Sequence, residues 1–370
     1  MYLTLDDYRK ESVNRLTKMA RDYYEAGSDT ESSLRRNEAA FRRLLVIPRC
    51  LRDVSQIDCQ TDWLNTVVKI PIGVAPSAFQ KMAHPQGELA TIRGASQAGT
   101  LMILSSWSTT AVGEVTNEAS RYGGHVWFQL YVYRDREITK YLIEQAEKAG
   151  VKALVLTVDT PVLGRRLTDQ RNNFKLPEHL GFANIPKSDK RQQMEEVEQG
   201  HSGLLDYVKH QIDPSLSWQT LKWIKTKTSL PIVVKGVMRP EDALLAIEHG
   251  ASGIIVSNHG GRQMDSTAAT IEVLPSVIRS VNKKIPVFVD GGIRSGQDAL
   301  KAVALGATGV FIGRPILWAL SVEGASGVKR ALNIMQQEFT EGMRLVGCRS
   351  IKELQEDKNL IVHENNVHKL

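Results

Sequence analysis

The sequence predicts an α/β fold: a single (β/α)8 TIM barrel with an N-terminal helical segment and a long lid loop after strand 4. Eight short apolar runs alternate with amphipathic helical stretches along the chain, and this alternation is typical of a parallel sheet. The eight units span about 250 residues, the usual size of such a barrel. A doubly wound sheet is the main alternative, but no G-x-G-x-x-G motif follows the first apolar run.

The predicted elements divide one domain, residues 1–370, into three parts. Residues 1–65 read as helices, residues 66–325 as the barrel, and residues 326–370 as a C-terminal helix and tail. The two N-terminal helices are predicted over 5–26 and 30–45. The eight strands are predicted over 70–75, 101–104, 126–130, 153–158, 231–234, 253–256, 286–289 and 309–312. Helices between them are predicted over 87–98, 136–149, 240–249, 271–281 and 296–305.

The interval between the fourth and fifth strands is much longer than the others. Within it, residues 213–228 read as a helix with Ser215 or Ser217 as its cap. Residues 172–202 are polar, charged and poor in aliphatic side chains. Because a long loop in a compact domain is commonly a lid, we expect this one to lie over the end of the barrel that carries the site.

Composition argues against several classes of protein. The net charge is +6 and no basic stripe is interleaved with aromatic residues, so no nucleic-acid partner is expected. No apolar run approaches about 18 residues, and residues 1–10 are unlike a signal peptide, so no membrane association is expected. Cys50, Cys59 and Cys348 are odd in number and lack metal-ligand spacing, so neither a disulfide framework nor a metal site is expected.

All eight predicted strands end in polar, charged or very small residues. We call the residues at and just beyond the carboxyl end of each strand its exit. The ligand site of a (β/α)8 barrel lies at the carboxyl ends of its strands, so eight polar exits favour a ligand pocket over ordinary turn chemistry. From first to eighth, the exit residues are Pro76, Ser77 and Ala78; Ser105 and Trp107; Gln129 and Tyr131; Thr157 and Asp159, with Arg166 beyond them; Lys235; Ser257, His259 and Arg262; Asp290, Gly291, Gly292, Ile293 and Arg294; and Gly313 and Arg314.

The sixth exit, residues 257–265, combines a base with a cation. His259 can take a proton at neutral pH, and Arg262 offers a planar fork to a carboxylate or phosphate. Taken alone, this stretch is also compatible with a helix-capping turn and one solvated arginine. The number of similar exits favours the functional interpretation.

The seventh and eighth exits predict a phosphate site. Glycines at 291, 292 and 313 let backbone N–H groups approach an anion, and Arg294 and Arg314 supply forks. Phosphate sites commonly follow strands seven and eight of such barrels. A phosphate-tailed cofactor or a phosphorylated substrate is therefore expected.

Other exits suit a heterocyclic ring. Lys235 either forms a salt bridge or holds an electron-rich ring, such as that of a reduced flavin. Ser105, Gln129, Thr157 and Ser257 are uncharged hydrogen-bonding residues suited to ring carbonyls and ring nitrogens.

Motifs spread over nearly the whole chain resemble those of the FMN-dependent α-hydroxy-acid oxidases, most closely the glycolate-oxidase members. The resemblance runs from Asp22-Tyr23-Tyr24 to about residue 350. Its motifs include Ala75-Pro76-Ser77-Ala78, Leu104-Ser105-Ser106-Trp107, Gln129-Leu130-Tyr131, Leu156-Thr157-Val158-Asp159-Thr160-Pro161, Val234-Lys235-Gly236, Ser257-Asn258-His259-Gly260-Gly261-Arg262-Gln263, Asp290-Gly291-Gly292 and Gly313-Arg314-Pro315. Residues 117–125 and 182–200 depart from the family pattern.

This resemblance implies a role for each exit residue. His259 would be the active-site base, with Asp159 stabilising its imidazolium. Implied substrate ligands are Tyr23, Trp107, Tyr131, Arg166, His259 and Arg262. Implied FMN ligands are Pro76, Ser77, Ala78, Ser105, Gln129, Thr157, Lys235, Ser257, Asp290, Gly291, Gly292, Ile293, Arg294, Gly313 and Arg314.

The implied activity is FMN-dependent oxidation of a short-chain (S)-2-hydroxy acid to the 2-oxo acid, with O2 reduced to hydrogen peroxide. The same residues serve a hydride or a carbanion route. Alternatives within the family are a long-chain 2-hydroxy-acid oxidase and a lactate oxidase or dehydrogenase. A non-catalytic phosphate-ligand-binding barrel is the alternative from a different class, and it would be expected to lack His259, Asp159 or one of the arginines.

The resemblance also implies assembly and location. A homo-oligomer, tetramer or octamer, is expected by resemblance. His368-Lys369-Leu370 resembles the S-K-L type of peroxisomal address, which predicts a peroxisomal enzyme. A cytoplasmic location is the alternative if this tripeptide is not read.

Overall fold

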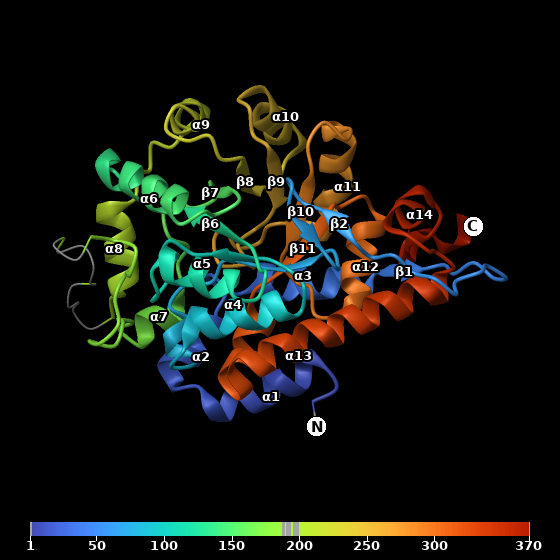
Figure 1. Ribbon diagram of the computed structural model, residues 1–370, viewed down its shortest axis with the longest axis horizontal. Helices are drawn as coiled ribbons and strands as arrows, with labels where there is room; N and C mark the ends of the chain where they lie inside the picture. The colour runs from blue at the N-terminus through green and yellow to red at the C-terminus, as the bar shows by residue number, and fades with distance from the viewer. Residues whose placement is uncertain (1, 187–188, 190–193, 195–199, 370) are drawn as a thin grey trace.

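Eight parallel strands close into a barrel, so the predicted (β/α)8 fold is confirmed (Figure 1). The computed structural model describes residues 2–186, 189, 194 and 200–369. The strands are β4 Ile72–Val74, β5 Met102–Leu104, β6 Val126–Leu130, β7 Leu154–Thr157, β8 Ile232–Val237, β9 Gly253–Val256, β10 Val287–Asp290 and β11 Gly309–Ile312. They pair in the order β10-β11-β4-β5-β6-β7-β8-β9, so each strand lies beside its neighbours in the chain.

Helices form the outer layer around this barrel. They are α4 Gly87–Gln97, α5 Val112–Ser120, α6 Arg136–Lys148, α9 Trp218–Lys225, α10 Pro240–Glu248, α11 Thr270–Val281, α12 Gly296–Ala304 and α13 Arg314–Val346. The helices predicted between strands agree with α4, α6, α10, α11 and α12 to within one residue at each end. Because helices cover the outer face and side chains fill the interior, the strands are largely apolar on both faces.

Aromatic residues fill the amino-terminal end of the barrel. A short hairpin, β2 Thr61–Asp62 and β3 Val67–Val68, holds the fully buried Trp63 against the start of β11. The Trp63 ring lies 5.0 to 6.3 Å, centroid to centroid, from the rings of Trp127, Phe288 and Phe311. This packing closes the bottom of the barrel and leaves the carboxyl ends of the strands for a ligand.

The first predicted helix, over residues 5–26, is wrong in one respect, because two helices occupy this stretch. They are α1 Leu5–Arg15 and α2 Lys18–Glu25. Leu16 has an extended backbone, and the Thr17 side chain accepts a hydrogen bond from the Ala20 N–H. A threonine hydroxyl in this position caps a new helix, so α2 begins here as a separate helix.

The second predicted helix, over 30–45, is shorter than expected. Helix α3 covers Ser32–Arg42. It is followed by β1 Leu44–Val46, which pairs antiparallel with β12 Ile361–His363 near the C-terminus. The partner strand lies more than 300 residues away in the chain, so no local pattern marks this pairing.

The interval after β7 contains more helix than predicted. Helix α7 covers Leu167–Arg171 and α8 covers Gly203–Gln211. Helix α9 begins after Ser217, one of the two predicted caps, rather than at residue 213. The predicted lid over residues 172–202 falls partly outside the described residues, so its conformation as a whole stays a prediction.

The C-terminal helix begins earlier than residue 326. Helix α13 starts directly after β11 and runs from Arg314 to Val346, with non-helical backbone at Gly324. It packs against α1 and α4, and Figure 1 shows it crossing the lower part of the view, above α1. Helix α14, Ile351–Glu356, β12 and a 3-10 helix, Glu364–Lys369, follow α13. Within the described residues no helix is long and apolar enough to cross a membrane.

Candidate active site

One pocket of about 970 Å³, including its open mouth, lies at the carboxyl ends of the barrel strands. It gathers residues from every strand exit and from α2. Of the predicted site residues, all but Asp159 and Ser257 line this pocket. Those two lie behind the lining, where each holds a lining residue by a hydrogen bond.

Six further residues line the same pocket and were not predicted as ligands. They are Tyr24, Ala75, Gly260, Phe311, Ile312 and Leu317. Tyr24 adjoins Tyr23 at the end of α2, and its hydroxyl donates to the Phe79 carbonyl at 2.7 Å. Leu317 lies one helical turn after Arg314 in α13, so helical spacing from a predicted ligand is the signal that could have found it.

His259 is held by a buried carboxylate. Its Nδ1 lies 2.9 Å from Asp159 Oδ1. The backbone at His259 has a φ of +57°, which is uncommon for a residue other than glycine, and its N–H donates to Ser257 Oγ. Strand β8 makes room for the carboxylate with a bulge at Gly236, where a Cβ atom would lie 2.7 Å from Asp159 Cβ.

This pair is poised for proton acceptance at neutral pH. Burial lowers the pKa of His259 below 6.5, and Lys235 and Arg166 lower it further, against the opposing effect of Asp159. Burial raises the pKa of Asp159, but His259 and Lys235 outweigh burial and leave this pKa below its ordinary value. An ionised Asp159 can only accept, so Nδ1 of His259 carries its proton and Nε2 is left as the basic nitrogen.

Lys235 lies in a short polar chain between β8 and β10. Its Nζ donates to Ser257 Oγ at 3.0 Å and lies 3.4 Å from Asp290 Oδ2. Ser257 Oγ in turn donates to Asp290 Oδ1 at 2.6 Å. Lys235 was predicted either to form a salt bridge or to hold a ring. The ammonium forms an ion pair with Asp290 and also lines the pocket, so it can do both.

Uncharged hydrogen-bonding side chains run across the adjacent strand ends. Gln129 Nε2 donates to Thr157 Oγ1 at 3.1 Å. Gln129 Oε1 accepts from Ser106 N–H at 3.1 Å and from Ser105 Oγ at 3.3 Å. This network fixes the orientation of the amide, and it presents hydroxyl and amide groups to the pocket.

Two arginines, Arg262 and Arg166, line the pocket together with His259. Arg262 Nη1 donates to the carbonyls of Tyr23 at 2.7 Å and Ala26 at 2.8 Å, and its guanidinium lies 5.0 Å from the Tyr23 ring centroid. Burial lowers the pKa of Arg262 to about 10, so it stays charged at neutral pH. Arg166 Nη1 lies 3.8 Å from Asp169 Oδ2. Its buried Nε has no hydrogen-bond partner among the residues described.

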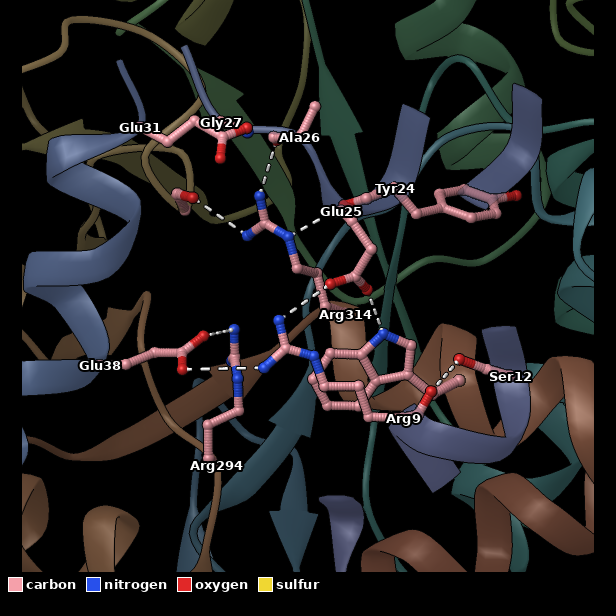
Figure 2. Close-up of polar contacts among 12 residues, drawn as sticks. Arg9, Ser12, Tyr24, Glu25, Ala26, Gly27, Glu31, Glu38, Arg294 and Arg314 are labelled. Carbon is pink, nitrogen blue, oxygen red and sulfur yellow. Dashed lines mark hydrogen bonds and ion pairs between the residues drawn. The ribbon is translucent and has the colours of Figure 1, made fainter. Parts of the chain in front are cut away.

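The predicted phosphate end also carries two arginines (Figure 2). Arg314 donates to the carbonyls of Tyr24, Ala26 and Gly260 at 2.9 to 3.0 Å, and burial lowers its pKa to about 9. The Arg314 fork is therefore partly committed to the protein, a feature that the sequence did not predict. Arg294 donates to Glu38 Oε1 at 2.9 Å, and its buried Nε has no partner within the described part of the chain.

The pocket suits an elongated ligand with a hydrogen-bonding ring at one end and an anionic group at the other. The basic nitrogen of His259 faces this space together with Arg166 and Arg262, as expected of a site that removes a proton from an anionic substrate. No cluster of three or more metal-binding side chains occurs among the residues that the structure describes.

Comparison with known proteins gives a consistent result. The family model for FMN-dependent dehydrogenase matches residues 12–361. Glycolate oxidase of Spinacia oleracea is 51% identical over 351 residues, which cover 95% of this chain and 93% of that protein. 2-Hydroxyacid oxidase 1 of Homo sapiens is 48% identical over 362 residues, covering 97% of this chain and 96% of that protein.

A solved structure gives the corresponding result for the fold. A crystal structure of mandelate oxidase with (S)-4-hydroxymandelic acid superposes on this chain with a TM-score of 0.91 at 39% sequence identity. The superposition covers 96% of this chain and 98% of that one.

Proposed function

The chain belongs to the FMN-dependent dehydrogenase family, and from this premise we propose that it oxidises a short-chain (S)-2-hydroxy acid such as glycolate. The product is the 2-oxo acid, and O2 is reduced to hydrogen peroxide. The carbon–hydrogen bond and the hydroxyl O–H of the substrate supply the two electrons and two protons that convert O2 to peroxide. The observation that carries this proposal is the His259–Asp159 pair, whose histidine lines one pocket with Arg166, Arg262 and the residues predicted to bind phosphate.

The residues of the pocket fit FMN. We propose that Arg294, Arg314 and the backbone at 291, 292 and 313 hold its phosphate. The Nε of Arg294, which has no partner in the described part of the chain, supports this role. The ring would lie against Lys235, with further ligands at Pro76, Ser77, Ala78, Ser105, Gln129, Thr157, Ser257, Asp290 and Ile293. When bound, FMN supplies an acceptor for the two electrons of the substrate.

The remaining pocket residues would bind and activate the substrate. Arg166 and Arg262 pair with its carboxylate, because guanidinium groups bind carboxylates through two parallel hydrogen bonds. Burial raises the pKa of Tyr23 and of Tyr131, so both hydroxyls stay protonated and can donate to substrate oxygens.

The proton of the substrate would move to one atom. Nε2 of His259 accepts it, and the ionised Asp159 stabilises the resulting imidazolium through Nδ1–H. The same arrangement serves a route in which the hydroxyl proton leaves and one in which the α-proton leaves.

Trp107 supports the preference for a small substrate. It is buried, its ring stacks on Tyr131 with centroids 4.3 Å apart, and its Nε1 donates to the Tyr133 hydroxyl at 3.2 Å. Phe182 meets the indole edge-on at 6.2 Å. These contacts fix the indole in the pocket wall, where it takes space that a longer alkyl chain would need.

The proposal also covers the location of the protein in the cell and its oligomeric state. The S-K-L-like tripeptide supports a peroxisomal address, although Leu370 lies outside the described residues. Deleting the last three residues of a fluorescent fusion would then move it from peroxisomes to the cytosol, and unchanged puncta would contradict this address. Light scattering of the purified protein would give a tetramer or octamer if the family resemblance extends to assembly.

A panel of 2-hydroxy acids tests the function directly. Glycolate, lactate, mandelate and 2-hydroxyoctanoate are supplied in turn, and oxygen uptake is measured together with peroxide. We expect the highest kcat/KM with glycolate and one peroxide per oxygen consumed. A preference for 2-hydroxyoctanoate would assign a long-chain oxidase instead, and turnover with a dye but not with oxygen would assign a dehydrogenase.

A further inference from the structure

A group of charged residues joins the N-terminal helices to the phosphate end of the pocket (Figure 2). Arg9 of α1 lies 3.2 Å from Glu25 of α2 and 4.0 Å from Glu38 of α3. The other oxygen of Glu38 accepts from Arg294 Nη2 at 2.9 Å. One carboxylate thus bridges a helix that precedes the barrel and an arginine of the predicted phosphate site.

An indole ring completes this group. The guanidinium of Arg9 lies 5.2 Å from the Trp318 ring centroid, and that of Arg294 lies 5.3 Å from it. The indole N–H of Trp318 donates to Glu25. Each arginine therefore meets both the indole and a carboxylate, and the group is held together by hydrogen bonds as well as by charge.

Glu38 fixes the orientation of Arg294. The guanidinium is tied at Nη2 by Glu38 and at Nη1 by the Ile293 carbonyl, whereas its buried Nε lacks a partner within the described residues. Burial lowers the pKa of Arg294, and Glu38 and Glu25 oppose this change. Glu38 therefore favours the charged form of the arginine and fixes its orientation, and the Nε–H, which has no partner among the described residues, is left for a phosphate oxygen.

Helix α3 also shapes the backbone of the cradle. Gly292 has a φ of +83°, and a Cβ atom there would lie 2.1 Å from the carbonyl oxygen of Asn37. The Asn37 side chain pairs with that of Asn258, with hydrogen bonds of 2.8 Å in both directions. The residue next to Glu38 is thus packed onto the loops that carry the phosphate and base residues.

We propose that Glu38 is a positioning residue for the phosphate of FMN, supported by Arg9, Glu25 and Trp318. Phosphate binding and the docking of α1, α2 and α3 are then thermodynamically coupled, and each favours the other. This inference rests on the FMN site proposed above. It goes beyond that site because Glu38, Arg9 and Glu25 do not line the pocket.

A comparison of two flavins isolates the contribution of the phosphate to the binding affinity. FMN and riboflavin share the ring and the ribityl chain, and only FMN carries the phosphate. Full-length apoprotein is titrated with each flavin, and binding is followed by quenching of flavin fluorescence. For Glu38→Gln we expect FMN affinity to fall about tenfold, within the usual range of coupling between sites, while riboflavin affinity is unchanged.

A matched control separates this role from the loss of any surface ion pair. Glu364→Gln removes a carboxylate that lies 2.9 Å from Arg43, in a contact between the same N-terminal segment and the C-terminal tail. This variant should bind both flavins as the native protein does. If apoprotein of the Glu38 variant does not stay folded, the rate of FMN release from diluted holoprotein gives the same comparison, with faster release expected.

The coupling has a second readout in the protein itself. Adding FMN to the native apoprotein should slow hydrogen exchange in α1, α2 and α3, and this protection should be smaller in Glu38→Gln. Tighter FMN binding by the variant would show that Glu38 competes with the phosphate, which overturns the proposal. An unchanged FMN affinity, or an equal loss for both flavins, would also overturn it. Failure of the native protein to bind FMN would contradict the proposed function instead.

Discussion

The pKa of His259 is set by two opposing effects. The Asp159 carboxylate favours its charged form, while burial and nearby cations favour its neutral form. The neutral form prevails, so the residue can accept a proton at physiological pH. This balance depends on a Nδ1–Oδ1 contact of 2.9 Å and on the bulge at Gly236 that admits the carboxylate.

Replacing His259 with Gln should remove the base and leave the cofactor site. The expected result is a protein that retains FMN but whose flavin is reduced at least about 10²-fold more slowly by glycolate, the lower end of the usual effect of losing a general base. Stopped-flow absorbance measures this rate. The matched control is His125→Gln, because His125 is a partly buried histidine outside the pocket. A nearly native rate in the His259 variant would rule out its assigned role.

The pH dependence follows from the lowered pKa of His259. Its neutral form is the active one, so kcat/KM should be level near neutrality and fall only as the pH drops below 6.5. Since the unfolded protein binds this proton more readily, the same group makes the fold less stable as the pH falls below that value. A pH profile of kcat/KM checks this expectation. An activity that begins to fall well above pH 6.5 on the acid side would contradict it.

Arg262 should not tolerate exchange for lysine. Lysine keeps the charge but loses the fork and cannot reach the Tyr23 and Ala26 carbonyls in the same way. Losing one charge-assisted hydrogen bond is equivalent to about tenfold in binding, so KM for glycolate should rise by about that factor or more. Arg165→Lys, at an exposed ion pair with Asp29, is the control. Equal turnover of a 2-hydroxy acid and its amide would argue against the carboxylate clamp.

At the scale of the element, the loop after β10 and helix α3 form one packed unit. Gly292→Ala places a methyl group against the Asn37 carbonyl at 2.1 Å and also strains a positive φ. Gly123→Ala is the matched control, since it has a φ of +64° and no atom within 4 Å. The strain alone costs about 1–2 kcal/mol, so the control should lose roughly that much stability. The Gly292 variant should lose more, as measured by thermal unfolding; equal losses would show that the contact with α3 is unimportant.

The elements of the barrel follow well from the sequence, while those outside it do not. Runs such as 126–130 and 253–256 coincide with β6 and β9, because buried strands between helices give uninterrupted apolar segments. The break at Thr17 was missed because one hydroxyl cap decides it. The pairing of β1 with β12 was missed because it joins distant segments whose local patterns show no partner.

Within the pocket, too, the residues that the barrel strands carry could be predicted, whereas their contacts with other segments could not. Residues at the strand exits could be placed from chain order and barrel geometry. Their partners could not, because Glu38 and the Ala26 carbonyl come from helices that precede the barrel. No spacing rule relates those helices to the loops after β10 and β11. The predicted phosphate arginines were therefore found without the contacts that orient them.

At the scale of the whole molecule, the two ends of the barrel serve different purposes. Trp63 and the aromatic residues around it close the amino-terminal end. The carboxyl end holds the pocket, and α2 and α3 contact the side where phosphate binding is proposed. Segments far apart in the chain thus enclose one site, where we propose that FMN binds and accepts electrons from a 2-hydroxy acid.

Anaerobic reduction of the bound flavin by glycolate tests this central claim most directly. The purified protein should be yellow, and its flavin absorbance should bleach when glycolate is added without oxygen. Admitting air should restore the absorbance, with one glyoxylate and one peroxide formed for each flavin reduced and reoxidised. A flavin that stays oxidised with glycolate, lactate and longer 2-hydroxy acids alike would contradict the account.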